Sequence, residues 1–409
     1  MAYINRLQFG DSPNLDAFGR LRTSDPFTQF DWKNTFSPST FANQQFWDVA
    51  VVGSGTASPV ANQSAIRLST GGTTDTHAAT IHTKQHFIYQ PGKSRRILQT
   101  FVMSAAVTDA TAEIGYGDAN DGIFLQRADS TVNLIRRTST SGSPVETTVA
   151  QSSWDDPMDG TGASGKTLDL TKTQILAIDL EWLGVGRVRV SFIIDGVEYV
   201  VHEFKHANSL SLVYMKTGSL PVRAQVINTA TASGTLTMDV ICTSVVSEGG
   251  YEAGNYPQFY ASTGTSALST STTLLPLISL RCATSFNSET FRGHIIPRVF
   301  GALVASNIHE YQIVKNGALT SASFTAANST YSAAEYDVSA SAISGGIVMD
   351  GGYIPAAGNQ RNSDDAELFS KLPIVYTSLN NTQETITLAV RTVTGTGSAY
   401  GNISWQEEY

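Results

Sequence analysis

Between Arg187 and Phe204 the sequence has the pattern of a tight β-hairpin. Apolar side chains alternate with polar or small ones on both sides of Asp195-Gly196, a dipeptide that favours the two-residue type I′ turn. This turn pairs Ile194 with Val197, Phe192 with Tyr199, and Val190 with Val201. Both strands then place apolar side chains on one common face, which fixes the register of the hairpin against a core.

The same two-residue alternation recurs along the chain. The runs 176–182, 236–242 and 386–390 carry apolar residues at every second position, and Gly-containing turn signals separate such runs. Many short strands without an intervening helical pattern predict an all-β protein built of sandwiches or jelly rolls. The one helix that we expect is short, from about Asp365 to Lys371, with Asp364 as its cap and Pro373 after its end.

The 409 residues exceed what one hydrophobic core usually serves, which predicts two domains and an appendage. Residues 1–44 are rich in aromatic residues and prolines but show no sustained alternation. We therefore expect an extended N-terminal arm that lies across its own domain or a neighbouring subunit. Residues 45–248 carry the densest strand pattern and form the first sandwich. A linker follows at 249–257, and residues 258–409 form a second β-sandwich.

Charge and cysteine content exclude several classes of protein. Only 15% of the residues are charged, and a net charge of −9 without any basic run argues against nucleic-acid binding. Two cysteines are too few for a disulfide framework, and Cys242 lies in an alternating run where we expect it to be buried. No apolar stretch approaches the ~18 residues of a membrane span, and no signal-peptide core is present at the start. We expect synthesis in the cytoplasm and no membrane insertion.

Three histidines, His77, His82 and His86, are the first candidates for a metal site. On an extended strand His77 and His82 face opposite sides, and His82 and His86 stand roughly 13 Å apart. Zinc needs ligand atoms about 2 Å from one centre. We therefore expect polar strand or loop histidines, and no metal or other cofactor.

The segment Asp118-Ala119-Asn120-Asp121-Gly122 resembles the start of a calcium loop. An EF-hand loop has a bidentate Glu at its twelfth position, where this sequence has Asp129, and we expect no flanking helices. A tight turn is the simpler interpretation. The alternative is a loop that binds calcium or a glycan through Asp118, Asn120, Asp121 or Trp154.

No residue pattern points to catalysis. Asp179 and Glu181 alternate with apolar residues and are expected on the solvated face of a strand. Acidic residues in the loop around Trp154 more often shape turns than form the carboxylate pair of a glycosidase. The chain has neither a Gly-x-Ser-x-Gly elbow nor a phosphate-binding loop, so we expect a protein that is not an enzyme.

A resemblance to known proteins comes from the arm. The segment 15–28, LDAFGRLRTSDPFT, followed by Phe30-Asp31, is similar to a segment near the N-terminus of many structural proteins of tailed-phage virions. The stretches 86–94, 121–125, 181–186 and 194–196 resemble the same proteins, in which they belong to a concanavalin-like jelly-roll domain. The resemblance covers residues 10–250 approximately. It implies that fold and a place in a virion assembled in the host cytoplasm, and it supplies no catalytic residues.

The arm is the element that we expect to dock on a partner. Gly19 permits a sharp backbone turn, and Arg20 and Arg22 are suited to pair with carboxylates of the partner. Aromatic side chains of the same arm are expected to anchor in apolar pockets, namely Phe18, Phe27, Phe30 and Trp32.

These observations predict a structural component of a tailed-phage virion, such as a fibre, collar, decoration or baseplate-associated subunit, that acts by protein–protein assembly. Shared interfaces close symmetric assemblies, which favours a homotrimer or another symmetric homo-oligomer beside other virion proteins. The alternative is an adhesin of the same particle that binds a host-surface carbohydrate. An enzymatic depolymerase is a distant third.

Overall fold

In a computed structural model the chain forms two compact units, Met1–Glu252 and Ala253–Tyr409. The structure describes residues 14–16, 19–21, 25–35, 45–60, 62–250, 256–356 and 373–409, and the backbone of 360–363. Phe18, Arg22 and the helix expected from Asp365 to Lys371 lie outside the described residues. Among the described residues no helix has the length and apolar character to cross a bilayer.

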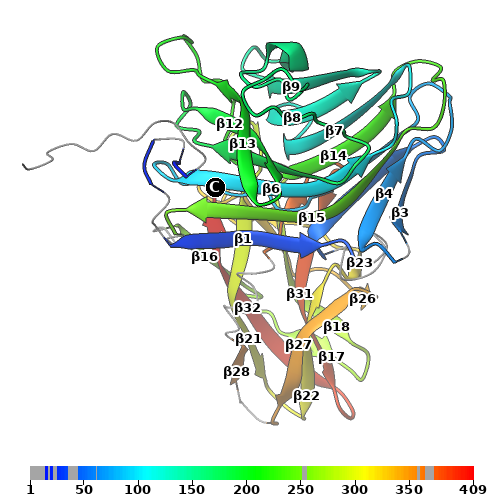
Figure 1. Cartoon of the computed structure of the whole chain (residues 1–409). Helices are drawn as coiled ribbons and strands as arrows, with labels where there is room; N and C mark the ends of the chain where they lie inside the picture. Colours follow the sequence, from blue (N-terminus) through cyan, green and yellow to red (C-terminus); the bar gives the residue numbers. More distant parts are fainter. Residues whose placement is uncertain are drawn as a thin grey trace, which may run out of the picture. The chain divides into compact units, whose positions relative to one another are not determined.

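The first unit is a sandwich of two antiparallel sheets (Figure 1). In spatial order the eight-stranded sheet consists of β13 (Val197–Phe204), β12 (Val188–Ile194), β11 (Gln174–Leu180), β6 (Ser94–Met103), β15 (Thr237–Glu248), β4 (Ala65–Ser69) and β3 (Thr56–Val60), and β1 (Pro26–Lys33) also pairs with β15. The seven-stranded sheet consists of β10 (Val145–Ala150), β9 (Thr131–Thr138), β8 (Gly122–Ala128), β7 (Ala110–Gly117), β14 (Val222–Asn228), β5 (Ala78–Thr83) and β2 (Trp47–Val52). A 3-10 turn, η1 (Gln151–Ser153), follows β10.

The chain of the first unit crosses repeatedly between its two sheets. Strands β6 and β7 are consecutive in sequence but belong to different sheets, as do β14 and β15. The neighbours of β6 in its own sheet are therefore strands from distant parts of the chain, β11 and β15. Figure 1 shows β6, β15 and β1 side by side. Apolar residues at alternate positions of both sheets fill the space between them, for example Ile97, Phe101, Ile114 and Val226. This arrangement confirms the expected concanavalin-like jelly-roll sandwich.

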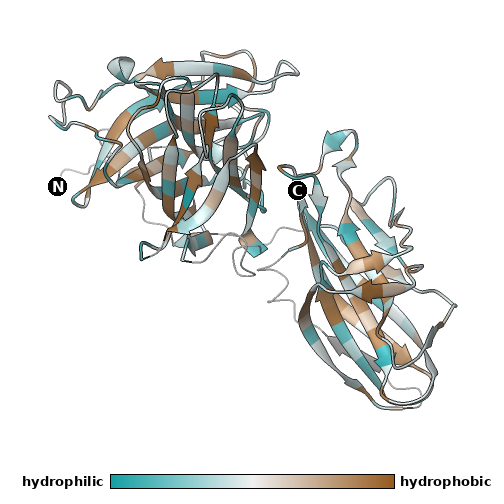
Figure 2. Cartoon of the chain, turned by 90° about the vertical axis from the view of Figure 1, so that its right-hand side faces the viewer, coloured by the Kyte–Doolittle hydropathy of each residue, from teal (hydrophilic) through white to brown (hydrophobic). Residues whose placement is uncertain are grey.

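The second unit is a smaller sandwich with its own core. One sheet consists of β16 (Gln258–Ser262), β32 (Gly397–Glu408), β21 (His294–Val304) and β28 (Gln360–Ser363), with β17 (Leu268–Thr270) also pairing with β32. The other consists of β24 (Thr325–Ala326), β25 (Ala334–Asp337), β18 (Leu275–Cys282), β31 (Thr385–Thr392), β22 (His309–Lys315) and β27 (Ile347–Ile354). Three two-stranded ribbons complete it: β19 (Ser285–Phe286) with β20 (Glu289–Thr290), β23 (Ala318–Thr320) with β26 (Ala342–Ser344), and β29 (Tyr376–Thr377) with β30 (Thr382–Gln383). Figure 2 shows apolar residues concentrated along the strands of both units, which confirms the expected second β-sandwich.

The hairpin β12–β13 has the predicted turn. Asp195 and Gly196 both have positive φ, 51° and 77°, as the type I′ turn requires. Ile194 pairs with Val197 and Phe192 with Tyr199 as predicted, but Val190 pairs with His202 and not with Val201, because the register shifts by one residue between Val190 and Ser191. A β-bulge of this kind leaves no trace in a simple alternation of apolar residues.

A second bulge corrects the prediction for Cys242. The alternation through Met238 and Val240 predicted a buried thiol at the next position in phase, whereas Cys242 is exposed. The register of β15 against β6 shifts between Val240 and Cys242, so the strand turns its other face to the core from that point on. Cys282 is buried.

Part of the expected arm is a strand of the first sandwich. Strand β1 pairs antiparallel with β15 from Pro26 to Lys33, with a register shift between Thr28 and Phe30. The shift interrupts the alternation, which explains why the sequence showed no sustained strand pattern there. The arm and the jelly roll are therefore continuous in structure at residues 26–33.

Candidate functional site

The described part of the N-terminal segment forms a tight turn, here called the arm turn, made of Leu15, Asp16 and Gly19–Leu21. Gly19 has φ 79°, and its N–H donates to the carbonyl of Asp16 at 2.9 Å, so the glycine turns the chain as the sequence predicted. The guanidinium of Arg20 pairs with the Asp16 carboxylate at 2.6 Å and donates a hydrogen bond to the carbonyl of Gly92 at 3.4 Å. Leu15 and Leu21 form a β-bridge that closes the turn.

The arm turn rests on buried charges of its own domain. Arg189 of β12 donates a hydrogen bond to the carbonyl of Leu15, and Arg187 donates one to the carbonyl of Asp16 at 3.2 Å. Arg189 is 0% exposed and also donates to Asp179 at 3.2 Å. Asp179 itself is 1% exposed, with Arg96 at 3.6 Å on its other side. The prediction that Asp179 faces solvent is therefore wrong, because the arm turn covers this part of the sheet.

The aromatic residues of β1 differ in their surroundings. Phe30 lies in the core of its own sandwich, with its ring centroid 5.9 Å from that of Trp47 and 5.6 Å from that of Phe87. Trp32 is half-buried against Phe46, at 4.5 Å between ring centroids. Phe27 is 44% exposed. Of these three side chains, Phe27 presents the largest surface to an outside partner.

Glu181, the other acid that we expected in solvent, is also buried, beside the arm turn. Its carboxylate packs so closely on Gly186 that a Cβ there would lie 2.2 Å from Oε2, which makes a side chain at position 186 incompatible with this packing. Burial raises the pKa of Glu181 to about 6, and the nearby charge of Asp16 adds to the rise, whereas Arg20 and Arg187 oppose it.

The raised pKa of Glu181 predicts a pH-dependent stability. A carboxyl group whose pKa is higher in the folded chain than its ordinary value of 4.5 favours folding fully below pH 4.5, and this contribution is lost as the pH rises through about 6. We expect the melting temperature of the wild type to fall between pH 4.5 and pH 7 relative to Glu181→Gln, measured by calorimetry at both pH values. Parallel pH profiles of the two proteins would contradict this assignment.

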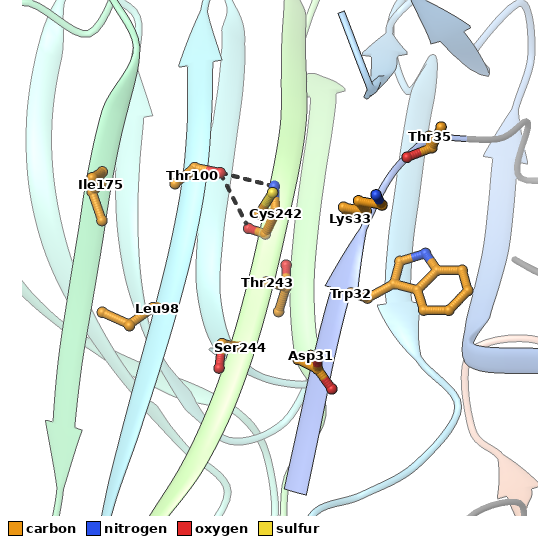
Figure 3. A pocket seen from close by; sticks show the side chains of 10 residues that line it. All are labelled: Asp31, Trp32, Lys33, Thr35, Leu98, Thr100, Ile175, Cys242, Thr243 and Ser244. Atoms are coloured by element: carbon orange, nitrogen blue, oxygen red, sulfur yellow. Dashed lines mark hydrogen bonds between the residues drawn. The ribbon is translucent and has the colours of Figure 1, made fainter. Parts of the chain in front are cut away.

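A hollow of about 590 Å³ lies on the outer face of the eight-stranded sheet (Figure 3). It is lined by residues of β1, β6, β11 and β15 and by Thr35: Asp31, Trp32, Lys33, Thr35, Leu98, Thr100, Ile175, Cys242, Thr243 and Ser244. Leu98, Ile175 and Cys242 make an apolar floor. The hydroxyl of Thr100 accepts the backbone N–H of Cys242 at 2.8 Å and lies 3.5 Å from its carbonyl oxygen (dashed lines in Figure 3), which ties the bulge of β15 to β6.

A second hollow of about 570 Å³ continues the first across the sheet. The two hollows share Thr100 and Ile175, and we call their combined lining the groove. Its far end has polar residues around Ile193, namely Thr167, Asp169, Lys172, Thr173, Gln174 and Asp195. No pattern in the sequence predicted the groove. The feature that could have revealed it is a pair of isoleucines on the outward face of their strands. Ile175 and Ile193 stand next to Leu176 and Phe192, which point into the core.

The candidate calcium or glycan loop is a closed turn. The Asp118 carboxylate accepts the N–H groups of Asn120 and Asp121 at 2.7 and 2.9 Å, as in an Asx turn. The Asp121 carboxylate accepts from the N–H and hydroxyl of Ser139 and from the N–H of Lys216. These bonds agree with the simpler interpretation, a tight turn.

Trp154, the fourth residue of that prediction, is buried in the core, and its Nε1 donates to the carbonyl of Val149 at 3.0 Å. Its ring is therefore covered and offers no platform to a sugar.

The histidines lie differently from the extended strand that we assumed. The chain turns after β5, so the ring centroids of His82 and His86 are 6.4 Å apart and not roughly 13 Å as an extended strand gives. Burial lowers the pKa of His82, whose Nδ1 lies 2.7 Å from the carbonyl of Thr83. Within the described ranges, no three side chains of His, Cys, Asp or Glu come together as a metal-binding group.

The outer face of the seven-stranded sheet carries a compact polar cluster. Arg137 pairs with Glu113 and with Glu146, each at 2.6 Å, and its guanidinium lies 4.6 Å from the ring centroid of Phe124. Arg223 lies 3.8 Å from Glu113 and is buried. The cluster thus combines two arginines, two carboxylates and one ring on a single sheet face.

No family model and no curated protein matches the chain. Among solved structures, the carbohydrate recognition domain of Emp47p aligns with 54% of the chain and 96% of its own length, at 11% identity and a TM-score of 0.35. A protein of unknown function from Shewanella oneidensis MR-1 aligns over 61% of the chain and 100% of its own, at 13% identity and a TM-score of 0.36. The Crh5 transglycosylase in complex with NAG aligns over 56% and 85%, at 16% identity and 0.33. Scores this low assign neither a family nor an activity to the chain.

Proposed function

We propose that this chain is a structural component of a tailed-phage virion and that it binds neighbouring virion proteins through the groove, without catalysis. The similarity of the segment 15–28 to virion proteins supports the location in the particle. The groove supports binding to other proteins, because protein–protein interfaces typically have an apolar centre surrounded by a polar rim, as the groove does.

The groove lies where a jelly roll usually presents polar residues. An antiparallel sheet that packs on a core with one face normally places polar side chains on the other. Here Leu98 and Ile175 occupy outward positions on adjacent strands, next to the exposed thiol of Cys242. A contiguous apolar surface of this kind is typical of a contact region that another protein covers.

In this proposal the arm turn has an internal role. Its backbone carbonyls accept hydrogen bonds from Arg187 and Arg189, and its one acid pairs with Arg20. It therefore stabilises the charged part of the sheet. The surfaces that contact partners are then the groove and the exposed side chain of Phe27.

Incorporation into particles tests the proposal. Mass spectrometry of purified virions of the phage that encodes the chain should detect its peptides. In a phage whose only copy of the gene carries Ile175→Glu, we expect at least a tenfold loss of the chain from particles, since a charge in the apolar floor has to be desolvated on contact. Val51→Glu is the matched control, because Val51 is an exposed valine on β2 of the other sheet.

The two variants should both fold, since neither replaced side chain belongs to the core. Equal far-UV circular dichroism and melting temperatures verify this. Absence of the wild-type chain from virions would refute the location, and equal incorporation of both variants would refute the role of the groove.

The second candidate function is carbohydrate binding by the same particle protein. The charged groups of Glu113, Arg137 and Arg223 on the outer face of the seven-stranded sheet support it, because polar groups of this kind orient a sugar through hydrogen bonds. The ring of Phe124 beside them is 0% exposed and does not contribute a surface for stacking. Binding of the full chain on a glycan array, lost in Arg223→Ala and kept in Ile175→Glu, would favour this function over the first.

A further inference from the structure

One row of side chains crosses the groove, with one residue from each of six neighbouring strands. Lys33 is the register partner of Cys242, Cys242 of Thr100, and Thr100 of Ile175. Because Leu176 pairs with Phe192, the next outward positions, Ile175 and Ile193, lie opposite each other, and Ile193 pairs with Glu198. In spatial order the row reads Lys33, Cys242, Thr100, Ile175, Ile193 and Glu198.

The row has opposite charges at its two ends and none between them. Lys33 is exposed on β1 at one end. At the other end, Glu198 on β13 is 13% exposed and pairs with Arg96 at 2.7 Å, so the exposed negative charge there is that of Asp195 in the adjacent turn. The four side chains between the ends are apolar or small, so burying the middle of the row costs less desolvation free energy than burying its ends.

We propose that a second copy of this chain packs face to face on the groove, related to the first by a two-fold axis that runs parallel to the strands between Thr100 and Ile175. A two-fold rotation reverses the row, so that Lys33 of each copy lies opposite Glu198 of the other. Cys242 then lies opposite Ile193, and Thr100 opposite Ile175. Two sheets that pack in this way lie about 10 Å apart, which long Lys and Glu side chains span.

The charge pattern selects a second copy over other occupants. Reversed on itself, the row brings the exposed Lys33 of each copy opposite the end of the other copy that carries the exposed Asp195, so two copies complement each other without further sequence requirements. The floor of Leu98, Ile175 and Cys242 carries no ring, so it suits an aliphatic protein surface better than a sugar. The inference rests on the proposed function in one respect only, namely that the groove is a protein-binding surface.

Site-directed crosslinking tests the geometry. In Ile193→Cys the new thiol should face the exposed Cys242 of the second copy, so a short bismaleimide reagent should give a covalent dimer on a denaturing gel. Positions 193 and 242 of one chain are three strand spacings apart, roughly 14 Å, so a linkage within one chain is not expected with a short reagent. The wild type should give no covalent dimer, because its two Cys242 thiols lie on opposite sides of the axis. Ile193→Cys/Cys242→Ser should give none either.

Sedimentation of the full chain tests the association itself. The wild type should sediment as a dimer, Lys33→Glu should raise the dissociation constant about tenfold, and Ile175→Glu should abolish the dimer. Val51→Glu should behave as the wild type. A monomeric wild type, or a dimer that Ile175→Glu leaves intact, overturns the proposal.

These outcomes separate the inference from the proposed function. If the purified chain is monomeric while Ile175→Glu still fails to enter virions, the groove binds another virion protein and only the two-fold contact is refuted. If the chain is a crosslinkable dimer but is absent from virions, the dimer stands and the location in the particle is refuted.

Discussion

Replacing Phe30 with alanine is expected to lower the free energy of unfolding of the first unit by about 3–5 kcal/mol, the usual loss for a buried phenylalanine. Phe30 is 6% exposed, and its ring meets those of Trp47, Phe87 and Phe46. Phe46 and Trp47 are the residue before β2 and the first residue of β2, and Phe87 lies in the segment after β5, so the lost ring leaves a cavity between β1 and these two segments. Urea unfolding followed by tryptophan fluorescence, which includes Trp47, measures the loss.

Phe27→Ala is the matched control on the same strand. Phe27 is 44% exposed, so its truncation should cost on the order of 0.5 kcal/mol. If both substitutions cost the same small amount, the ring of Phe30 is not part of the core and β1 is only loosely attached. A large loss for Phe30 alone means that β1 is a structural strand of the jelly roll.

This prediction changes how the N-terminal segment can be tested. Deletion of residues 1–40 removes β1 and with it the Phe30 ring, so it should unfold the first unit instead of producing a folded chain that lacks an arm. Removal of the arm turn alone leaves β1 in place. Loss of incorporation after the longer deletion therefore says nothing about docking.

The sequence predicted the all-β class and the hairpin at Asp195-Gly196, because both depend on local alternation and on a turn whose φ angles few residues adopt. It did not predict which side chains of β15 face solvent. One extra residue at the bulge before Cys242 exchanges the two faces of the strand, and bulges have no fixed sequence signal. The groove depends on that exchange, since Cys242 belongs to its floor.

The alternation of apolar residues could not predict that Asp179 and Glu181 are buried, for a different reason. Alternation places a residue on one face of its sheet but does not show what covers that face. Here the arm turn, more than 150 residues earlier in the chain, supplies the cover, and Arg189 bonds both to it and to Asp179. A contact of such long range follows from tertiary packing and not from a local pattern.

The second large effect is expected at this buried ion pair. Arg189→Met keeps the length of the side chain but removes the charge that faces Asp179, a carboxylate with 1% exposure, and the donor to the carbonyl of Leu15. Removal of one partner of a buried pair typically costs 3–5 kcal/mol, and we expect a loss of about that size in urea unfolding, because Arg96 at 3.6 Å compensates Asp179 only in part.

Two further variants decide whether burial is the cause. Arg67→Met breaks a bidentate pair with Asp239 at 2.7 Å on the same sheet, but this arginine side chain is about half exposed, so the loss should be about 1 kcal/mol. Arg189→Met/Asp179→Leu removes both buried charges and should recover most of the stability that the single substitution loses, since no carboxylate is then left to be desolvated. If the double variant is as unstable as Arg189→Met, the cost arises instead from the detached arm turn, and the bond from Arg189 to Leu15 is the main contribution of this arginine to the fold.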